Sequence, residues 1–94
     1  MIYIAHVGNK YQIERYSGDV QLRLDHSDIL NGKVYYDTPN TLRIETTLSY
    51  DVGQEVSIGG YPIGGKKFRL LELSITDNPI LENAKIIERR ILWQ

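Results

Sequence analysis

The chain has 94 residues, of which 41% are hydrophobic and 24% are charged, and its formal net charge is -1. This composition is typical of one soluble globular domain spanning residues 1–94, and a charge near zero provides no general attraction to nucleic acid or to an anionic membrane. The absence of cysteine excludes disulfides and thiolate metal sites, and no stretch approaches the ~20 apolar residues of a membrane-spanning helix.

The first strand signals begin at residue 2. Residues 2–7 and 10–16 are rich in β-favouring side chains and flank Gly8-Asn9. A Gly-X pair between two such runs predicts a β-hairpin with a two-residue turn. Polar residues interrupt the apolar run after Val7, and no basic leader precedes it. We therefore expect no signal peptide and a cytoplasmic protein.

Short strands and tight turns continue to residue 40. Residues 20–24 alternate apolar and polar side chains, which is the period of a half-buried strand. Residues 25–37 predict either a short helical turn or a hairpin around Asn31-Gly32. Asp37-Thr38-Pro39-Asn40 has the composition of a turn. No linker, repeat or low-complexity tract interrupts the series.

The longest alternation follows, over residues 42–50, and leads through a turn at 51–53 to a further strand at 54–58. Residues 67–76 also predict a strand. The apolar phase slips there between Leu70 and Leu71, which indicates a bulge or burial on both faces. We expect a core made of the inward-facing side chains Leu22, Leu24, Leu42, Ile44, Leu48, Val56, Ile58 and Leu70.

The C-terminal segment, residues 79–94, fits two structures. Asn78-Pro79 suits the start of a helix, one face of which would carry Ile80, Ala84, Ile87 and Ile91. The β-favouring runs instead predict a strand over residues 85–93 that would complete a barrel, and we prefer the strand. The whole pattern predicts a mainly β fold, a small antiparallel barrel or sandwich, OB-like or SH3-like, with six to seven short strands.

The glycine-rich stretch after Gly59 approximates a phosphate-binding loop, because G-x-x-x-x-G-K can be read from Gly60 to Lys66. Such a loop needs Ser or Thr after its lysine to hold magnesium, and a helix must follow. Lys67 occupies the Ser/Thr position, and residues 68–73 have strand character. We therefore expect a long hairpin loop over residues 59–66 and no nucleotide or other cofactor.

Asp25-His26-Ser27-Asp28 contains the residue types of a serine-hydrolase triad. Neighbours on a strand point to opposite faces, however, and the chain has no nucleophile elbow. A turn stabilised by these side chains is the better interpretation. His6 and His26 are too far apart in sequence to predict a metal site. We expect no catalytic residue, no metal ligand and no enzymatic activity.

Tyrosine is over-represented, with seven against one phenylalanine. Small β-barrels bind single strands by stacking bases on aromatic side chains beside basic ones. The candidates are Tyr3, Tyr11, Tyr35, Tyr36 and Tyr61, with Lys33, Arg43, Lys66, Lys67 and Arg69. Twelve acidic residues are spread through the same strands. An OB-like module that binds single-stranded nucleic acid is therefore the alternative function and not the preferred one.

The run PNTLRIETTLSYDVGQEVSIGGY resembles β-barrel domains of bacteriophage tail and baseplate proteins in its strand–turn–strand rhythm. The similarity covers about residues 39 to 75. The segment VGQEVSI also resembles stretches of translation-type barrels. The resemblance implies a virion assembly component without catalytic residues. It assigns no role to any single position.

From these observations we predict a non-enzymatic assembly module that docks on itself or on a larger protein complex, located in the virion if the chain is viral. Apolar side chains between glycines, and the lone tryptophan close to residue 94, are suited to an intermolecular contact. The predicted interface comprises Tyr61, Ile63, Ile87, Ile91 and Trp93. A small inhibitor or regulatory protein that acts by surface docking is a further alternative.

Overall fold

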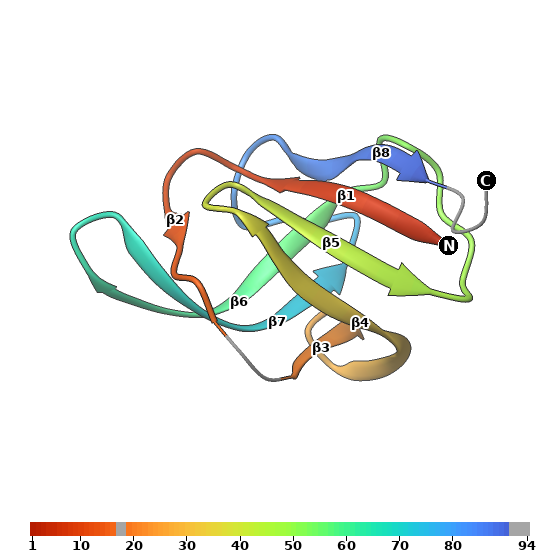
Figure 1. Ribbon diagram of the computed structural model, residues 1–94, viewed down its shortest axis with the longest axis horizontal. Helices are drawn as coiled ribbons and strands as arrows, with labels where there is room; N and C mark the ends of the chain where they lie inside the picture. Colours follow the sequence, from red (N-terminus) through yellow and green to blue (C-terminus); the bar gives the residue numbers. More distant parts are fainter. Residues whose placement is uncertain (17–18, 91–94) are drawn as a thin grey trace.

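The computed structural model describes residues 1–16 and 19–90, which contain strands and turns and no helix long and apolar enough to cross a membrane (Figure 1). Eight strands follow in chain order: β1 (Ile2–Val7), β2 (Gln12–Ile13), β3 (Val20–Leu24), β4 (Asp28–Thr38), β5 (Thr41–Thr46), β6 (Val56–Gly64), β7 (Lys67–Ile75) and β8 (Ala84–Arg90). The predicted mainly β class is confirmed. The number of strands is larger than the six to seven expected.

The strands form one mixed sheet in the order β2-β7-β3-β4-β5-β1-β8, and β6 pairs with β7 outside this path. Strand β7 is the junction. One edge of β7 pairs antiparallel with β6, and the other edge pairs in parallel with both β2 and β3. The expectation of a purely antiparallel sheet is therefore wrong. Parallel neighbours need a long connection, and here β4, β5 and β6 lie between β3 and β7 in the sequence.

The hairpin predicted at Gly8-Asn9 is wrong, because both edges of β1 are already occupied. Strand β1 pairs with β5 on one side and with β8 on the other. The chain instead crosses to the β4–β5 turn, where the Asn40 side-chain amide donates to the backbone oxygens of Gly8 and Tyr11, each at 3.3 Å. Strand β2 then joins β7 as a short parallel pair.

The segment 25–37 is neither a helical turn nor a hairpin around Asn31-Gly32. Strands β3 and β4 form the hairpin, but its turn lies earlier in the chain, and the Ser27 N–H donates to the Leu24 oxygen at 3.0 Å. The two central residues, Asp25 and His26, have φ values of 50° and 61°. Leu24 pairs with Asp28, so the loop has three residues, and the positive φ at Asp25 and His26 lets the chain reverse within them.

The turns predicted at residues 37–40 and 51–53 are confirmed. Strand β4 ends at Thr38 and β5 begins at Thr41, so the Pro39-Asn40 pair turns the chain as expected. Asn31-Gly32 lies inside β4, where Gly32 faces Thr46 of β5. A side chain at Gly32 would meet β5 backbone and the Leu22 side chain at 3.0 Å, so this glycine serves close packing and not a turn.

Rows of paired residues build the core. One row, which is buried throughout, crosses β3, β4, β5 and β1 as Val20, Val34, Ile44 and Tyr3. A second row crosses β4, β5, β1 and β8 as Tyr36, Leu42, Ala5 and Ile86. Cross-strand pairs of this kind are the main stabilising unit of a sheet, and they hold strands that are distant in sequence.

Two members of the predicted core are not buried. Leu24 is 40% exposed, because it ends β3 beside the turn, and Leu48 is only partly buried, because β5 stops at Thr46. The other six, Leu22, Leu42, Ile44, Val56, Ile58 and Leu70, are buried as expected.

The preferred C-terminal strand is confirmed as β8, while residues 91–94 lie outside the described part of the chain. The sheet stays open between β6 and β8. Glu55 and Lys85 form an isolated bridge there, and the Ile86 N–H donates to the Gln54 oxygen at 2.8 Å. The molecule is therefore an incompletely closed, barrel-like sheet.

Candidate functional site

The β6–β7 hairpin reaches away from the rest of the sheet, at the left of Figure 1, in a molecule with extents of 39 × 26 × 22 Å. Strand β6 continues through the glycine-rich stretch to Gly64, so the expectation of a long loop over residues 59–66 is wrong. The tight turn occupies only Gly65 and Lys66. The strand expected after Lys66 is present as β7, so this segment is not the strand–loop–helix unit of a phosphate-binding loop.

Tight backbone packing explains the glycines of this hairpin. A side chain at Gly60 would place its Cβ 2.0 Å from the Arg69 backbone oxygen, and the pairing with β7 shifts register on the N-terminal side of this residue. Pro62 faces Phe68 across the pair. Proline is tolerated there because β6 is an edge strand, where a missing N–H removes no bond to a second neighbour.

The outer half of the hairpin exposes three large apolar side chains, which we call the hairpin patch: Tyr61, Ile63 and Leu71, with 47%, 39% and 56% of their surface exposed. Tyr61 pairs with Arg69, so the two side chains share one face, and Leu71 follows two residues later on that face. Phe68 lies on the opposite face and is buried.

The remaining predicted interface residues are not part of this patch. Ile87 is 46% exposed on β8, which runs toward the end of the molecule opposite the hairpin tip (Figure 1). Ile91 and Trp93 lie outside the described residues. The structure therefore brings Tyr61 and Ile63 together and separates both from Ile87.

The tyrosines proposed to stack on bases fall into different environments. Tyr3 is fully buried and donates its hydroxyl to the Leu48 oxygen at 3.2 Å, so it cannot stack on a nucleotide. The Arg43 guanidinium lies 4.7 Å from the Tyr35 ring centre, a cation–π contact that already covers this ring. Tyr61 is the most exposed of the five candidates.

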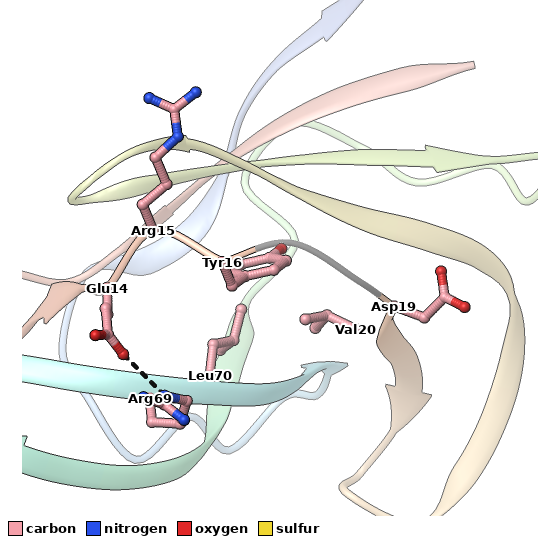
Figure 2. A pocket seen from close by; sticks show the side chains of 7 residues that line it. All are labelled: Glu14, Arg15, Tyr16, Asp19, Val20, Arg69 and Leu70. Atoms are coloured by element: carbon pink, nitrogen blue, oxygen red, sulfur yellow. Dashed lines mark hydrogen bonds and ion pairs between the residues drawn. The ribbon is translucent and has the colours of Figure 1, made fainter.

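A polar pocket of about 310 Å³ lies where the hairpin meets the segment after β2. Figure 2 shows Glu14 reaching Arg69 of β7, with 2.8 Å between Oε2 and Nε, while Arg15 extends away from this ion pair. The Tyr16 hydroxyl donates to the Val34 oxygen at 2.9 Å, and burial raises the pKa of Tyr16 to about 12. The charged lining is mixed in sign, so this pocket does not select a charged ligand.

A cluster of polar side chains lies inside the fold where the β3–β4 turn packs against β7. Glu72 of β7 is 7% exposed, and its carboxylate contacts His26 Nδ1 through Oε1. Its second oxygen, Oε2, accepts the Ser74 hydroxyl at 2.8 Å. The Ser74 oxygen in turn accepts the His26 backbone N–H at 2.7 Å. This His26–Glu72–Ser74 cluster gives a buried carboxylate the partners that it requires.

The chemistry of the cluster differs from that of a hydrolase triad. Ser74 donates its only proton to Glu72 and lies on the carboxylate side of the histidine, so the imidazole does not activate it. His26 Nε2 is buried and has no hydrogen-bond partner among the described residues. The arrangement holds the imidazole against the Glu72 carboxylate and leaves its second nitrogen enclosed by protein. Asp28, the other acidic neighbour in the turn sequence, is exposed at the start of β4.

A cavity of about 270 Å³ lies against His26. Its other walls are Gly59 and Gly60 of β6 and the largely apolar side chains Tyr11, Ile58, Phe68, Ile80 and Leu81. Gly59 faces Glu72 across the β6–β7 pair, and a Cβ on Gly59 would lie 1.9 Å from Glu72 Oε1. The glycine therefore makes room for the carboxylate that orients the imidazole.

Sequence reasoning missed this cluster because its members come from segments far apart in the chain. One signal was available: Glu72 continues the inward phase of Phe68 and Leu70, where an acidic side chain requires a buried partner. The turn predicted at Asp25-His26-Ser27-Asp28 is present, but the side chain that anchors it is His26, through Glu72, and this role was not foreseen.

Within residues 1–16 and 19–90, no group of three or more His, Asp or Glu side chains is placed to hold a metal ion. His6, weighed above as a metal ligand, lies on β1, and its Nδ1 accepts the Gly8 N–H at 3.2 Å. Comparison with protein-family models, with curated proteins and with solved structures found no match.

Proposed function

We propose that this chain is a non-enzymatic assembly module that docks on copies of itself through the hairpin patch. The observation that carries the proposal is the exposure of Tyr61, Ile63 and Leu71 on an arm that projects from the sheet (Figure 1). Tyrosine is enriched at protein interfaces, because it combines a large apolar area with a polar tip and loses little entropy on ordering. A neighbouring arginine, Arg69, is a second residue type favoured at binding hot spots.

Side-chain docking accounts for the arm better than strand addition does. An added strand needs a regular row of free N–H and C=O groups along the edge of β6. Strand β6 contains Pro62, and its pairing shifts register between Gly59 and Gly60 and again between Pro62 and Gly64. These features interrupt the edge, as is common where proteins prevent indiscriminate strand pairing. The contact would then depend on the patch side chains.

A head-to-tail contact between successive copies fits the positions of the exposed groups. The tip of the β6–β7 hairpin lies at one end of the long axis and β8, which carries the exposed Ile87, runs toward the other (Figure 1). The net charge of -1 produces little repulsion between copies. Such a heterologous contact generates a ring or a filament. A virion component, which the resemblance to phage tail and baseplate domains implies, is one setting for an assembly of this kind.

Complementation between two variants tests the proposal. Tyr61→Ser combined with Ile63→Ser removes the apolar contact surface on the hairpin, and Ile87→Ser removes the apolar contact surface on β8. We expect sedimentation to show that wild-type protein associates with rising concentration, that each variant alone stays monomeric, and that their mixture gives a one-to-one dimer. Ile29→Ser is the matched control, because Ile29 is 66% exposed on β4, outside both ends.

Two outcomes would decide against this arrangement. If the Ile87→Ser variant still dimerises alone, the hairpins pair with each other and the contact is not head-to-tail. If wild-type protein stays monomeric at every concentration, self-assembly is wrong, and the hairpin patch would have to meet a different protein.

A further inference from the structure

We propose that the part of the molecule formed by residues 8–16 and 59–71, which we call the basic end, docks on an anionic lipid surface. The tip of the β6–β7 hairpin would enter the headgroup region, and the basic side chains around it would meet the lipid phosphates. This contact does not depend on self-assembly. A lipid surface and a second copy would compete for the same hairpin patch.

The net charge of -1 is distributed unevenly over the chain. The two segments of the basic end contain five basic side chains and one acidic side chain, Glu14, so their charge is +4. The remaining 72 residues sum to -5. No acidic residue occurs between Glu55 and Glu72, a stretch that includes the whole outer half of the hairpin. The five basic side chains are Lys10, Arg15, Lys66, Lys67 and Arg69.

Strand β2 brings the two segments together. It pairs in parallel with the outer part of β7, where Gln12 lies opposite Lys67, and the Gln12 N–H donates to the Lys66 oxygen at 2.6 Å. Arg69 is bonded to Glu14, so this ion pair contributes no net charge. The other four basic side chains therefore lie on the hairpin or on the segment beside it (Figure 1).

The outer half of the hairpin combines this charge with exposed apolar surface. Tyr61 of β6 lies opposite Arg69 of β7, and Lys67 is two residues from Arg69, so the three side chains share one face. Ile63 and Leu71 are 39% and 56% exposed. Such a mixture suits a membrane surface, because tyrosine and aliphatic side chains enter the interface while lysine and arginine bind anionic headgroups.

A lipid surface fits these side chains better than a nucleic acid does. Bases stack on aromatic rings, but Phe68, the second aromatic side chain of residues 59–71, is buried, and Ile63 and Leu71 provide no ring. A lipid interface would take up all three members of the hairpin patch. Unpaired backbone groups on the free edge of β6 limit the depth to the headgroup region, because such groups are costly in hydrocarbon. Repulsion of the acidic remainder would orient the hairpin toward the lipid.

Vesicle sedimentation tests the requirement for charge. We would use dilute protein, at a concentration at which it is monomeric, with vesicles of phosphatidylcholine alone and with vesicles that contain about 30% phosphatidylserine. We expect at least about tenfold tighter binding to the phosphatidylserine vesicles, and weaker binding as the salt concentration rises. This comparison uses wild-type protein and needs no variant.

Two variants of equal net charge locate the contact. Lys66→Gln with Lys67→Gln removes two charges from the basic end, whereas Lys33→Gln with Lys85→Gln removes two exposed lysines on β4 and β8. Each basic side chain near an anionic lipid surface strengthens binding about fivefold. We therefore expect the first pair to weaken binding about 25-fold and the second pair by less than about threefold.

A fluorescent label tests whether the hairpin enters the interface. The chain has no cysteine, so Ile63→Cys introduces a single site for an environment-sensitive dye, and Ile29→Cys on β4 is the matched control. We expect phosphatidylserine vesicles to shift the emission of the dye at position 63 to shorter wavelength and to leave the dye at position 29 unchanged.

Several results would overturn the proposal: equal binding to the two kinds of vesicle, no binding to either, equal weakening by the two lysine pairs, or no response of the dye at position 63. Tighter binding to a duplex or single-stranded oligonucleotide than to the vesicles would instead assign the basic end to nucleic acid. Because all of these measurements use monomeric protein, their failure would leave the self-assembly proposal intact.

Discussion

The two halves of the β6–β7 hairpin have the same strand pairing and opposite environments. In the inner half, Val56 and Ile58 face β7 residues that are themselves buried, and β3 pairs with the other edge of β7. In the outer half the edge of β7 away from β6 pairs with the two-residue strand β2, and Tyr61 and Leu71 are exposed. Pairing alone therefore does not bury a hairpin. Burial follows the number of strands that pack around it, so the outer half is available for contacts with other molecules.

The largest effect on stability is expected at one of two leucines of β7 that are two residues apart. Leu73 is fully buried in the inner half, and Leu71 is 56% exposed in the outer half. We expect Leu73→Ala to lower the free energy of unfolding by about 2–5 kcal/mol, through lost burial and a residual cavity. Leu71→Ala should change it by no more than about 0.5 kcal/mol. Urea unfolding of both variants measures the difference, and similar losses would show that the two halves do not differ.

A smaller effect is expected at the boundary glycine. Gly60→Ala would bring its Cβ to 2.0 Å from the Arg69 oxygen, whereas Gly64→Ala, also at positive φ, would meet nothing within 4 Å. We expect Gly60→Ala to cost about 1–3 kcal/mol more than Gly64→Ala. The loss of stability should appear as faster amide hydrogen exchange, mainly in the outer half of the hairpin. A uniform rise in exchange across the whole sheet would mean that the halves unfold as one unit.

Tyr16 lies beside Leu70, where the hairpin passes from buried to exposed, and supplies a pH test (Figure 2). Burial raises the pKa of Tyr16 from 10.0 to about 12. Between these values the unfolded chain loses the phenolic proton while the folded chain keeps it, so stability falls as the pH rises. With about 1.4 kcal/mol per pKa unit, and some solvent screening, the loss should be roughly 1–2 kcal/mol. Tyr16→Phe should remove this part of the alkaline loss, and an unchanged profile would contradict it.

The smallest effect concerns the Glu14–Arg69 ion pair (Figure 2). Both side chains are more than a third exposed, so solvent and salt screen their attraction. We expect Glu14→Gln to leave the melting temperature unchanged at physiological salt, with Asp19→Asn, in the same pocket, as the control. A clear decrease confined to Glu14→Gln would show that this ion pair, and not side-chain packing, holds the hairpin against the segment after β2.

Local patterns in the sequence correctly predicted strands and turns, because these depend mainly on residues that are close together in the chain. The alternation around Leu42 and Ile44 identified β5 and its buried face, and the Pro39-Asn40 turn was placed correctly. The Gly8-Asn9 hairpin failed because β5 and β8 occupy both edges of β1, which no local pattern records.

The candidate sites were foreseen to different degrees. Tyr61 and Ile63 were selected from their apolar character between glycines, although they lie on a strand and not in a loop. The pairing of His26 with Glu72 depends on how the β3–β4 turn packs against β7. The sequence does not show which residues of such distant segments lie side by side. Only the position of Glu72 on the inward face of β7 could have indicated that it needs a buried partner.

The position of β1 has a consequence for how the chain folds. Tyr3 pairs with Arg89 on one edge and with Ile44 on the other, so β1 joins residues from near the two ends of the described chain. During synthesis, β1 and β5 would present an open edge until β8 emerges from the ribosome. Contacts of such high sequence separation slow folding, because a large loop must close before any pairing energy is gained. We expect the native sheet to form only once β8 is available, with the docking of β8 as a late step.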